Sequence, residues 1–136
     1  MTREHFLKGW SLAVGAMDSL TGLWLVLFPA SLLELLQVPP VSPDALVFVS
    51  WIGVFVLAVG LSYGLALLPR RARGETVWIF TAGVRALVAV FLTASILSES
   101  LPMVWAVVGV ADGVVALVQI AILRAGWWRD LHHRGP

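Results

Sequence analysis

Three ionisable residues lie inside long apolar stretches of this sequence, where charged side chains are rare. Asp18, Arg85 and Asp112 each lie about nine or ten residues from the nearer end of an apolar segment, which is close to the bilayer centre at 1.5 Å per residue. A charged side chain that faces lipid at this depth costs about 2.5 to 3.5 kcal/mol even on the lower insertion scales. We therefore expect the three side chains to point inward and to meet.

Two carboxylates and one guanidinium leave a net negative charge when all three groups are ionised, and such a charge is unfavourable in hydrocarbon. Arg85 stays protonated under ordinary conditions. Either one carboxyl group holds a proton or a cation occupies the site. We predict that Asp18 and Asp112 share an exchangeable proton. The alternative is that Asp18, Arg85 and Asp112 are only structural and fix the register of the helices.

Three further polar residues are candidates for a path from these charges toward the cytoplasm. Tyr63 and Gln119 fall at similar depths in the inner half of their segments, and Thr81 lies one helical turn from Arg85. For Tyr63 and Gln119 a simple hydrogen bond across a helix interface is the favoured alternative, because one polar residue per helix commonly bonds in this way. The sequence leaves both interpretations open.

The composition predicts that membrane-spanning helices position these residues. Hydrophobic residues make up 60% of the 136 residues and charged residues 12%, whereas soluble domains are about 25% charged. A helix needs about 20 apolar residues to cross the hydrocarbon core. The segments that meet this length are residues 9–28, 47–68, 76–97 and 103–123. We predict an all-α membrane protein, a four-helix transmembrane bundle that forms a single domain over residues 1–136.

Basic residues predict the orientation of this bundle, because arginine and lysine are enriched in cytoplasmic loops. Of nine basic residues, all but Arg85 precede the first span, separate the second from the third, or follow the fourth. These flanking residues are Arg3, Lys8, Arg70, Arg71, Arg73, Arg124, Arg129 and Arg134. The N and C termini are therefore expected on the cytoplasmic side.

Tryptophan residues lie near the predicted span ends, as expected from the preference of the indole ring for the membrane interface. The inner belt is expected to contain Trp10, Trp78, Trp127 and Trp128. The outer belt is expected to contain Trp24, Trp51 and Trp105.

Small residues predict where the helices approach one another, since helices in lipid pack closely through such positions. Gly15 and Gly22 share one face of the first span with Asp18, by their spacing of three and four residues. Gly60 and Gly64 have the corresponding spacing in the second span. We expect both pairs at helix interfaces.

A short helix is predicted after the first span, on the outer interface of the membrane. Residues 31–34, Ser-Leu-Leu-Glu, have the spacing of a capping box. The helix must end before Pro39 and Pro40, where the chain cannot continue helically. This segment is expected to act as a connector, and a lid over an outward cavity is the alternative.

Several classes of chemistry find no support in the sequence. The absence of cysteine excludes disulfides, thiolate metal sites and thiol catalysis. His5, His132 and His133 are all terminal, so we predict neither a metal site nor a haem held between spans. No phosphate-binding loop or nucleophile elbow is present, no cofactor is evident, and nucleic acid is not an expected partner.

The pattern of the whole chain resembles small bacterial membrane proteins described as DoxX-like. The resemblance rests on an aspartate in the first and last spans, on Pro29 at the end of the first, and on the runs Trp-Ile-Gly at residues 51–53 and Gly-Leu-Ser-Tyr at residues 60–63. It implies a multi-pass protein of the bacterial inner membrane, in a family named after a subunit of a quinol-linked oxidase. It implies no catalytic residues.

Three functions are compatible with these features. The first is a module that binds or transports a small lipophilic or ionic ligand through Asp18, Arg85 and Asp112, with coupling to a proton. The second is a non-catalytic subunit of a larger membrane complex. The third is an intramembrane acid-base enzyme for a lipid or isoprenoid. Membrane lipids are expected partners, together with further copies of the chain or the subunits of a complex.

Overall fold

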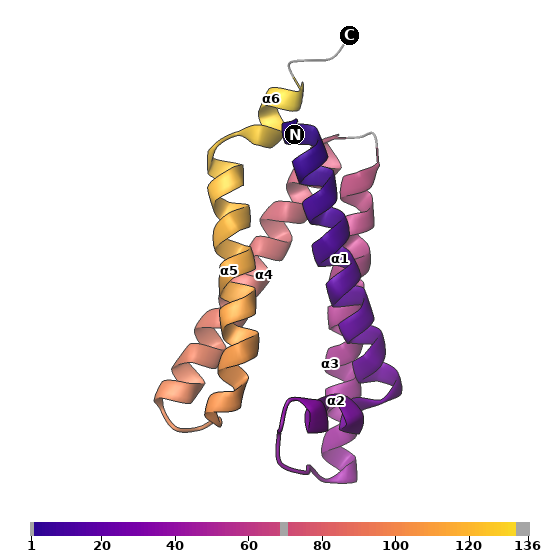
Figure 1. The fold of residues 1–136 in the computed structure, drawn as a ribbon, viewed down its shortest axis with the longest axis vertical. Coiled ribbons are helices and arrows are strands. Elements are labelled where there is room, and N and C mark those ends of the chain that lie inside the picture. The colour runs from indigo at the N-terminus through magenta and orange to yellow at the C-terminus, as the bar shows by residue number, and fades with distance from the viewer. Residues whose placement is uncertain (1, 69–70, 133–136) are drawn as a thin grey trace. The chain divides into compact units, whose positions relative to one another are not determined.

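The computed structural model describes residues 2–68 and 71–132, and over these residues the chain is helical with no strand. Figure 1 shows the order of the elements. They are α1 (Arg3–Leu27), α2 (Pro29–Leu35), α3 (Pro43–Ser62), η1 (Tyr63–Leu67), α4 (Arg71–Leu97), η2 (Met103–Trp105), α5 (Ala106–Arg124) and α6 (Trp127–His132), where η denotes a 3-10 helix.

In the described part of the chain, four helices are long and apolar enough to cross a membrane, which confirms the number predicted from the sequence. They cover Arg3–Leu27, Pro43–Leu67, Arg73–Leu97 and Met103–Arg124. The first begins before residue 9, where the predicted apolar span starts, because Thr2 caps it by accepting a hydrogen bond from the backbone N–H of His5. The third and fourth predicted spans likewise lie inside longer helical segments.

The chain forms two compact units, Met1–Leu68 and Pro69–Pro136. In the first unit, α1 packs against α3, and in the second, α4 packs against α5. Each pair is antiparallel and joined by a loop, and we call these units the first and second hairpins (Figure 1).

The first hairpin is held together by contact between the backbones of α1 and α3. A Cβ atom on Gly22 would lie 2.3 Å from the backbone nitrogen of Leu57, and one on Gly60 would lie 2.4 Å from that of Ser19. A Cβ on Gly53 would lie 2.9 Å from the carbonyl oxygen of Gly22. No side chain fits at these glycines without moving a helix, so the close approach depends on them.

The structure corrects one of the predicted glycine contacts in this hairpin. A Cβ on Gly64 would meet no heavy atom within 4 Å among the described residues, so Gly64 is not an interface position. The chain tightens at Tyr63 into the 3-10 helix η1, with 3.0 residues per turn, and this rotates Gly64 off the face that contains Gly60. Gly53, one turn before Leu57, provides the second close contact instead.

The short helix α2 exists, but the predicted capping box does not start it. The helix begins at Pro29, with Phe28 as the N-cap and no side-chain capping bond. Proline is favourable at this first position because its missing N–H would have no partner there. Ser31 lies inside the helix, and its hydroxyl accepts a hydrogen bond of 3.1 Å from the indole N–H of Trp24.

The second hairpin is packed more loosely than the first. A Cβ on Gly109 would lie 3.4 Å from Cβ of Leu92, and one on Gly113 would lie 3.7 Å from Cβ of Ala89. These are ordinary van der Waals distances, so side chains rather than backbone atoms separate α4 from α5. The wider spacing leaves room for polar side chains between these two helices.

Candidate functional site

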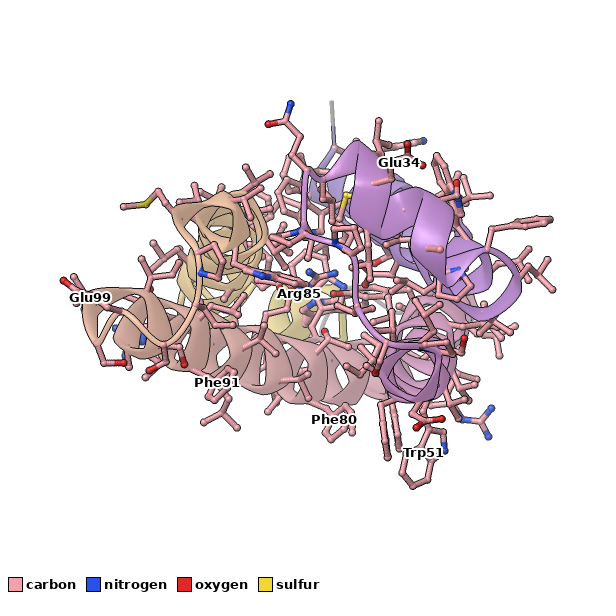
Figure 2. The ribbon with its side chains drawn as sticks, turned by 90° about the horizontal axis from the view of Figure 1, so that it is seen from below. Glu34, Trp51, Phe80, Arg85, Phe91 and Glu99 are labelled. Atoms are coloured by element: carbon pink, nitrogen blue, oxygen red, sulfur yellow. The ribbon has the colours of Figure 1, made fainter. Side chains whose placement is uncertain are left out.

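An ion pair between α4 and α5 is the central feature of the second hairpin. Nη1 of Arg85 donates a hydrogen bond to Oδ1 of Asp112. The Arg85 side chain is only 5% exposed and that of Asp112 is 18% exposed. Figure 2 shows Arg85 on the side of α4 opposite to Phe80 and Phe91, which point outward. The helix thus separates its charge from its apolar outer face.

A second polar contact lies nearer the N-terminal end of α4. Nε2 of Gln119 donates to Oγ1 of Thr81 over 3.3 Å, and the same hydroxyl donates to the carbonyl oxygen of Val77 over 2.8 Å. Both side chains are fully buried. The Thr81 hydroxyl therefore acts as donor and acceptor at once, and it ties α5 to α4 one turn from Arg85.

These two contacts form a continuous polar strip between the helices of the second hairpin. Thr81 precedes Arg85 by one turn, and Gln119 follows Asp112 by two turns, so the antiparallel helices place the pairs in sequence along their length. We call Thr81, Arg85, Asp112 and Gln119 the polar seam. The sequence identified all four residues, and the structure gives their pairing: Arg85 with Asp112 and Thr81 with Gln119.

Asp18 and Tyr63 belong to the first hairpin. Asp18 is buried in α1 beside Gly60, where an added Cβ would lie 2.9 Å from Cβ of Asp18. Tyr63 is buried at the start of η1 next to Gly15, whose added Cβ would lie 2.7 Å from Cβ of Tyr63. Because Gly60 and Gly15 have no side chain, there is space for Asp18 beside the first and for Tyr63 beside the second. A meeting of Asp18 with the ion pair stays a prediction.

The Arg85–Asp112 pair determines which species the seam is suited to bind. A guanidinium and a carboxylate neutralise each other and form a strong, charge-assisted hydrogen bond. Protonation of Asp112 would turn this neutral pair into a net positive group, and an anionic ligand would compete with Asp112 for Arg85. The arrangement is therefore suited to the binding of protons or ions.

Two of the tryptophans predicted for the inner belt pack against each other, and their depth in a membrane stays a prediction. The rings of Trp78 and Trp128 lie 5.6 Å apart at 74°, edge to face, and both side chains are buried. Tryptophan near a span end predicts an interfacial depth but not the side of the helix from which the ring projects. The Trp128 ring lies directly on Gly74, one turn before Trp78. A glycine at this position is the sequence feature that allows the contact.

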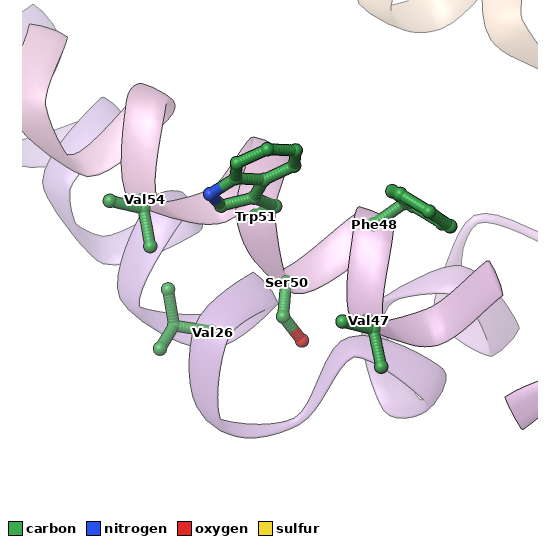
Figure 3. A pocket seen from close by; sticks show the side chains of 6 residues that line it. All are labelled: Val26, Val47, Phe48, Ser50, Trp51 and Val54. Carbon is green, nitrogen blue, oxygen red and sulfur yellow. The ribbon is translucent and has the colours of Figure 1, made fainter. Parts of the chain in front are cut away.

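A shallow apolar groove lies on the outer face of the first hairpin, away from Asp18 along α1. Its volume is about 400 Å³, and Figure 3 shows the side chains that line it. They are Val26, Val47, Phe48, Ser50, Trp51 and Val54. Only Ser50 among them is polar, so the groove offers a surface for hydrocarbon rather than for charge.

Of the three histidines, only His5 has a described side chain. Arg70, His133 and Arg134 lie outside the described residues. Among the described side chains, those of residues 2–68 and 73–129, no three histidine, aspartate or glutamate residues gather as metal ligands. The imidazole of His5 instead contacts the capping hydroxyl of Thr2.

Comparisons with known proteins give no match for this chain, either among protein-family models, among curated proteins or among solved structures.

Proposed function

We propose that this multi-pass membrane protein binds or transports a small lipophilic or ionic ligand through Asp18, Arg85 and Asp112, and that a proton is exchanged in the process. The observation that carries the proposal is the Arg85–Asp112 ion pair inside the second hairpin. This pair accounts for the only basic charge in the middle of a candidate span.

Charge balance provides the argument. The other described basic residues lie near or beyond the ends of the candidate spans. Asp18 is buried and the Asp112 side chain is 18% exposed, so the middle of the candidate spans contains two carboxyl groups for the one guanidinium of Arg85. Because an excess negative charge is unfavourable in a low-dielectric interior, neutrality requires a proton or a bound cation. A site that must take up such a species can also exchange it.

The proposed setting is a bacterial inner membrane with both termini in the cytoplasm and α2 on the outer interface. Arg3, Lys8, Arg73 and Arg124 support this orientation, because they flank the ends assigned to the cytoplasm. The resemblance to DoxX-like proteins supports the bacterial membrane. Labelling of cysteines introduced at residues 2 and 99 from either side of the membrane tests the topology.

Infrared difference spectra of the purified protein in lipid vesicles test the proton exchange, between about pH 4 and pH 9. We expect a protonated-carboxyl band that Asp18→Asn or Asp112→Asn removes. Asp44→Asn is the matched control, because Asp44 is exposed in the first turn of α3. A spectrum in which neither Asp18→Asn nor Asp112→Asn changes any carboxyl band would overturn the proposal. Mass spectrometry of small molecules and lipids retained by the purified protein then identifies the ligand.

A second candidate function is a non-catalytic subunit of a larger membrane complex. It is favoured by an aromatic row along α3, where the rings of Phe48, Trp51 and Phe55 lie next to one another, tilted by 51° and 54°, with centroid distances of 6.5 and 6.4 Å. Each of these rings is more than 60% exposed. Such a row suits a helix from another subunit or another copy of this chain. Loss of a co-purifying subunit in Trp51→Ala, with the carboxyl band unchanged, would support this function.

A further inference from the structure

Three arginines lie at the end of the second hairpin where α4 begins and α5 ends. Arg73 is at the N-terminal end of one candidate span and Arg124 at the C-terminal end of the next, so the antiparallel helices bring both to the same end of the hairpin. Arg129 lies in α6, which contacts α4 and α5 at this end (Figure 1). All three side chains are exposed. We call these residues the terminal arginines.

The helix α6 is held against the start of α4 by an aromatic contact. A Cβ on Gly74 would lie 2.4 Å from Cη2 and from Cζ3 of the Trp128 ring, so this ring lies on the backbone of α4 next to Arg73. The same ring packs edge to face against Trp78, one turn further along α4. Arg129 therefore follows a residue that is fixed to α4 immediately beside Arg73.

The Arg129 side chain turns back toward the end of α5. A Cβ on Gly126 would lie 3.8 Å from Nε and 3.9 Å from Nη2 of Arg129. Gly126 follows Arg124 by two residues and adopts the left-handed conformation at the turn that ends α5. The Arg129 guanidinium thus lies beside the turn that Arg124 precedes.

No described side chain neutralises the terminal arginines. Neither a hydrogen bond nor an ion pair joins Arg73, Arg124 or Arg129 to another residue in the described part of the chain. A helix C-terminus attracts basic side chains, yet Arg124 and Arg129 donate to none of the described carbonyl oxygens at the end of α5. Their N–H donors are therefore available to a ligand.

The charges at this end of the hairpin favour an anion as that ligand. Among the described side chains, Glu75 is the carboxylate that lies close to Arg73 along α4. Three guanidinium groups thus stand against one carboxylate. Like charges at one end of a helix pair repel one another, and a bound anion removes this repulsion.

The position of the terminal arginines favours a lipid as the source of the anion. Arg73 and Arg124 flank apolar spans, so in a bilayer their guanidinium groups lie at the depth of the lipid headgroups. A guanidinium binds the oxygens of a phosphate through parallel N–H donors. The half-buried ring of Trp127 lies between Arg124 and Arg129 in the chain and is of the type that prefers this interface.

We propose that Arg73, Arg124 and Arg129 bind the headgroup of an anionic phospholipid. The lipid phosphate accepts hydrogen bonds from the guanidinium groups, and the net negative charge of the headgroup offsets their excess positive charge. The role of α6 is to position Arg129 at the bilayer surface. The site does not involve Arg85 or Asp112, so it is independent of the proposed function.

Native mass spectrometry of the purified protein in detergent tests the lipid site. The probes are phosphatidylglycerol and phosphatidylcholine with identical acyl chains, added in equal amounts, because both contain a phosphate but only the first has a net negative charge. We expect phosphatidylglycerol to be bound in preference by about tenfold or more. Arg73→Gln, Arg124→Gln and Arg129→Gln should each lower the preference by about threefold to fivefold, and the triple variant should abolish it.

Lys8→Gln is the matched control for the loss of one positive charge. Lys8 lies in α1 and already pairs with Glu4 over 2.9 Å, so the preference should stay unchanged. Gly74→Ala tests the position of α6, because the added methyl group displaces the Trp128 ring and Arg129 moves with it. It should lower the preference as much as Arg129→Gln, and the two substitutions together should cause no further loss.

Gly83→Ala is the control for Gly74→Ala on the same helix, since its Cβ would meet no heavy atom within 4 Å among the described residues. A triple arginine variant that keeps the preference would overturn the site. Equal losses in Lys8→Gln and Arg129→Gln would also overturn it, because the preference would then follow the overall charge. Displacement of phosphatidylglycerol by millimolar inorganic phosphate would assign the arginines to a soluble anion instead. An unchanged preference in Gly74→Ala would overturn the role of α6.

Discussion

Gly22 of α1 lies so close to Leu57 of α3 that a Cβ atom on the glycine would be 2.3 Å from the backbone nitrogen of the leucine. Helices in lipid gain little from the hydrophobic effect, so their association depends on such close contacts. The first hairpin therefore derives its stability from glycine positions. The second derives it from side-chain packing and polar pairs.

Substitution Gly22→Ala should destabilise the first hairpin strongly. The methyl group meets backbone atoms of α3, which cannot rotate away, so we expect a loss of about 3 kcal/mol, at the upper end for overpacking. Equilibrium unfolding of the purified protein in mixed detergent measures this loss. Gly9→Ala is the matched control on the same helix, because its Cβ would meet no heavy atom within 4 Å among the described residues. An equal effect of the two substitutions would argue against the backbone contact.

The ion pair predicts strong coupling between Arg85 and Asp112. Arg85→Gln leaves the Asp112 carboxylate without this partner in a largely buried position, and removal of one member of a buried pair costs about 3 to 5 kcal/mol. The double variant Arg85→Gln with Asp112→Asn should recover much of that loss, since neither charge remains. Unfolding free energies of the four proteins give the coupling directly. Additive effects within about 0.5 kcal/mol would show that the pair contributes nothing.

The spans and the need of Arg85 for a partner were predictable from the sequence for a simple reason. A charge in hydrocarbon is so unfavourable that Arg85 must be paired, and Asp112 in a neighbouring apolar segment is a suitable partner. Hydropathy likewise determines where helices of about 20 residues can cross a membrane. These predictions depend on the type and the position of residues, which the sequence contains.

The packing details were not predictable, because they depend on local geometry. Spacing alone made Gly60 and Gly64 equivalent, but the 3-10 turn at Tyr63 changes the rotation per residue and removes Gly64 from the interface. Ser31 matched a capping motif, yet Pro29 starts the helix two residues earlier. The inward position of Trp128 depends on the direction of α6 after Gly126, which no periodicity encodes.

The Thr81–Gln119 contact predicts a separation between stability and activity. In Gln119→Leu the Thr81 hydroxyl keeps its bond to the carbonyl oxygen of Val77, so the loss of stability should stay below about 1 kcal/mol, as for other hydrogen bonds between membrane helices. If Gln119 belongs to the polar path, proton exchange in vesicles should fall by about tenfold or more in the same variant. A large loss of stability with unchanged exchange would make the contact purely structural.

The turn after α4 predicts a stabilising substitution. Glu99 adopts a left-handed conformation, with φ of 58°, and the N–H of Ser100 donates to the carbonyl oxygen of Ser95 over 2.9 Å. This is the helix C-terminal geometry that glycine prefers, because a side chain in that conformation costs about 1 kcal/mol or more. Glu99→Gly should therefore raise the unfolding free energy by about 1 kcal/mol.

The matched comparison for Glu99→Gly lies at the end of α5, where Gly126 has φ of 71°. Its N–H donates to the carbonyl oxygen of Leu123 over 3.1 Å, in a related C-terminal turn. Gly126→Ala introduces the strain that Glu99→Gly removes, so the two substitutions should shift the unfolding free energy by about 1 kcal/mol in opposite directions. If both shift it in the same direction, backbone conformation does not limit the stability of the second hairpin.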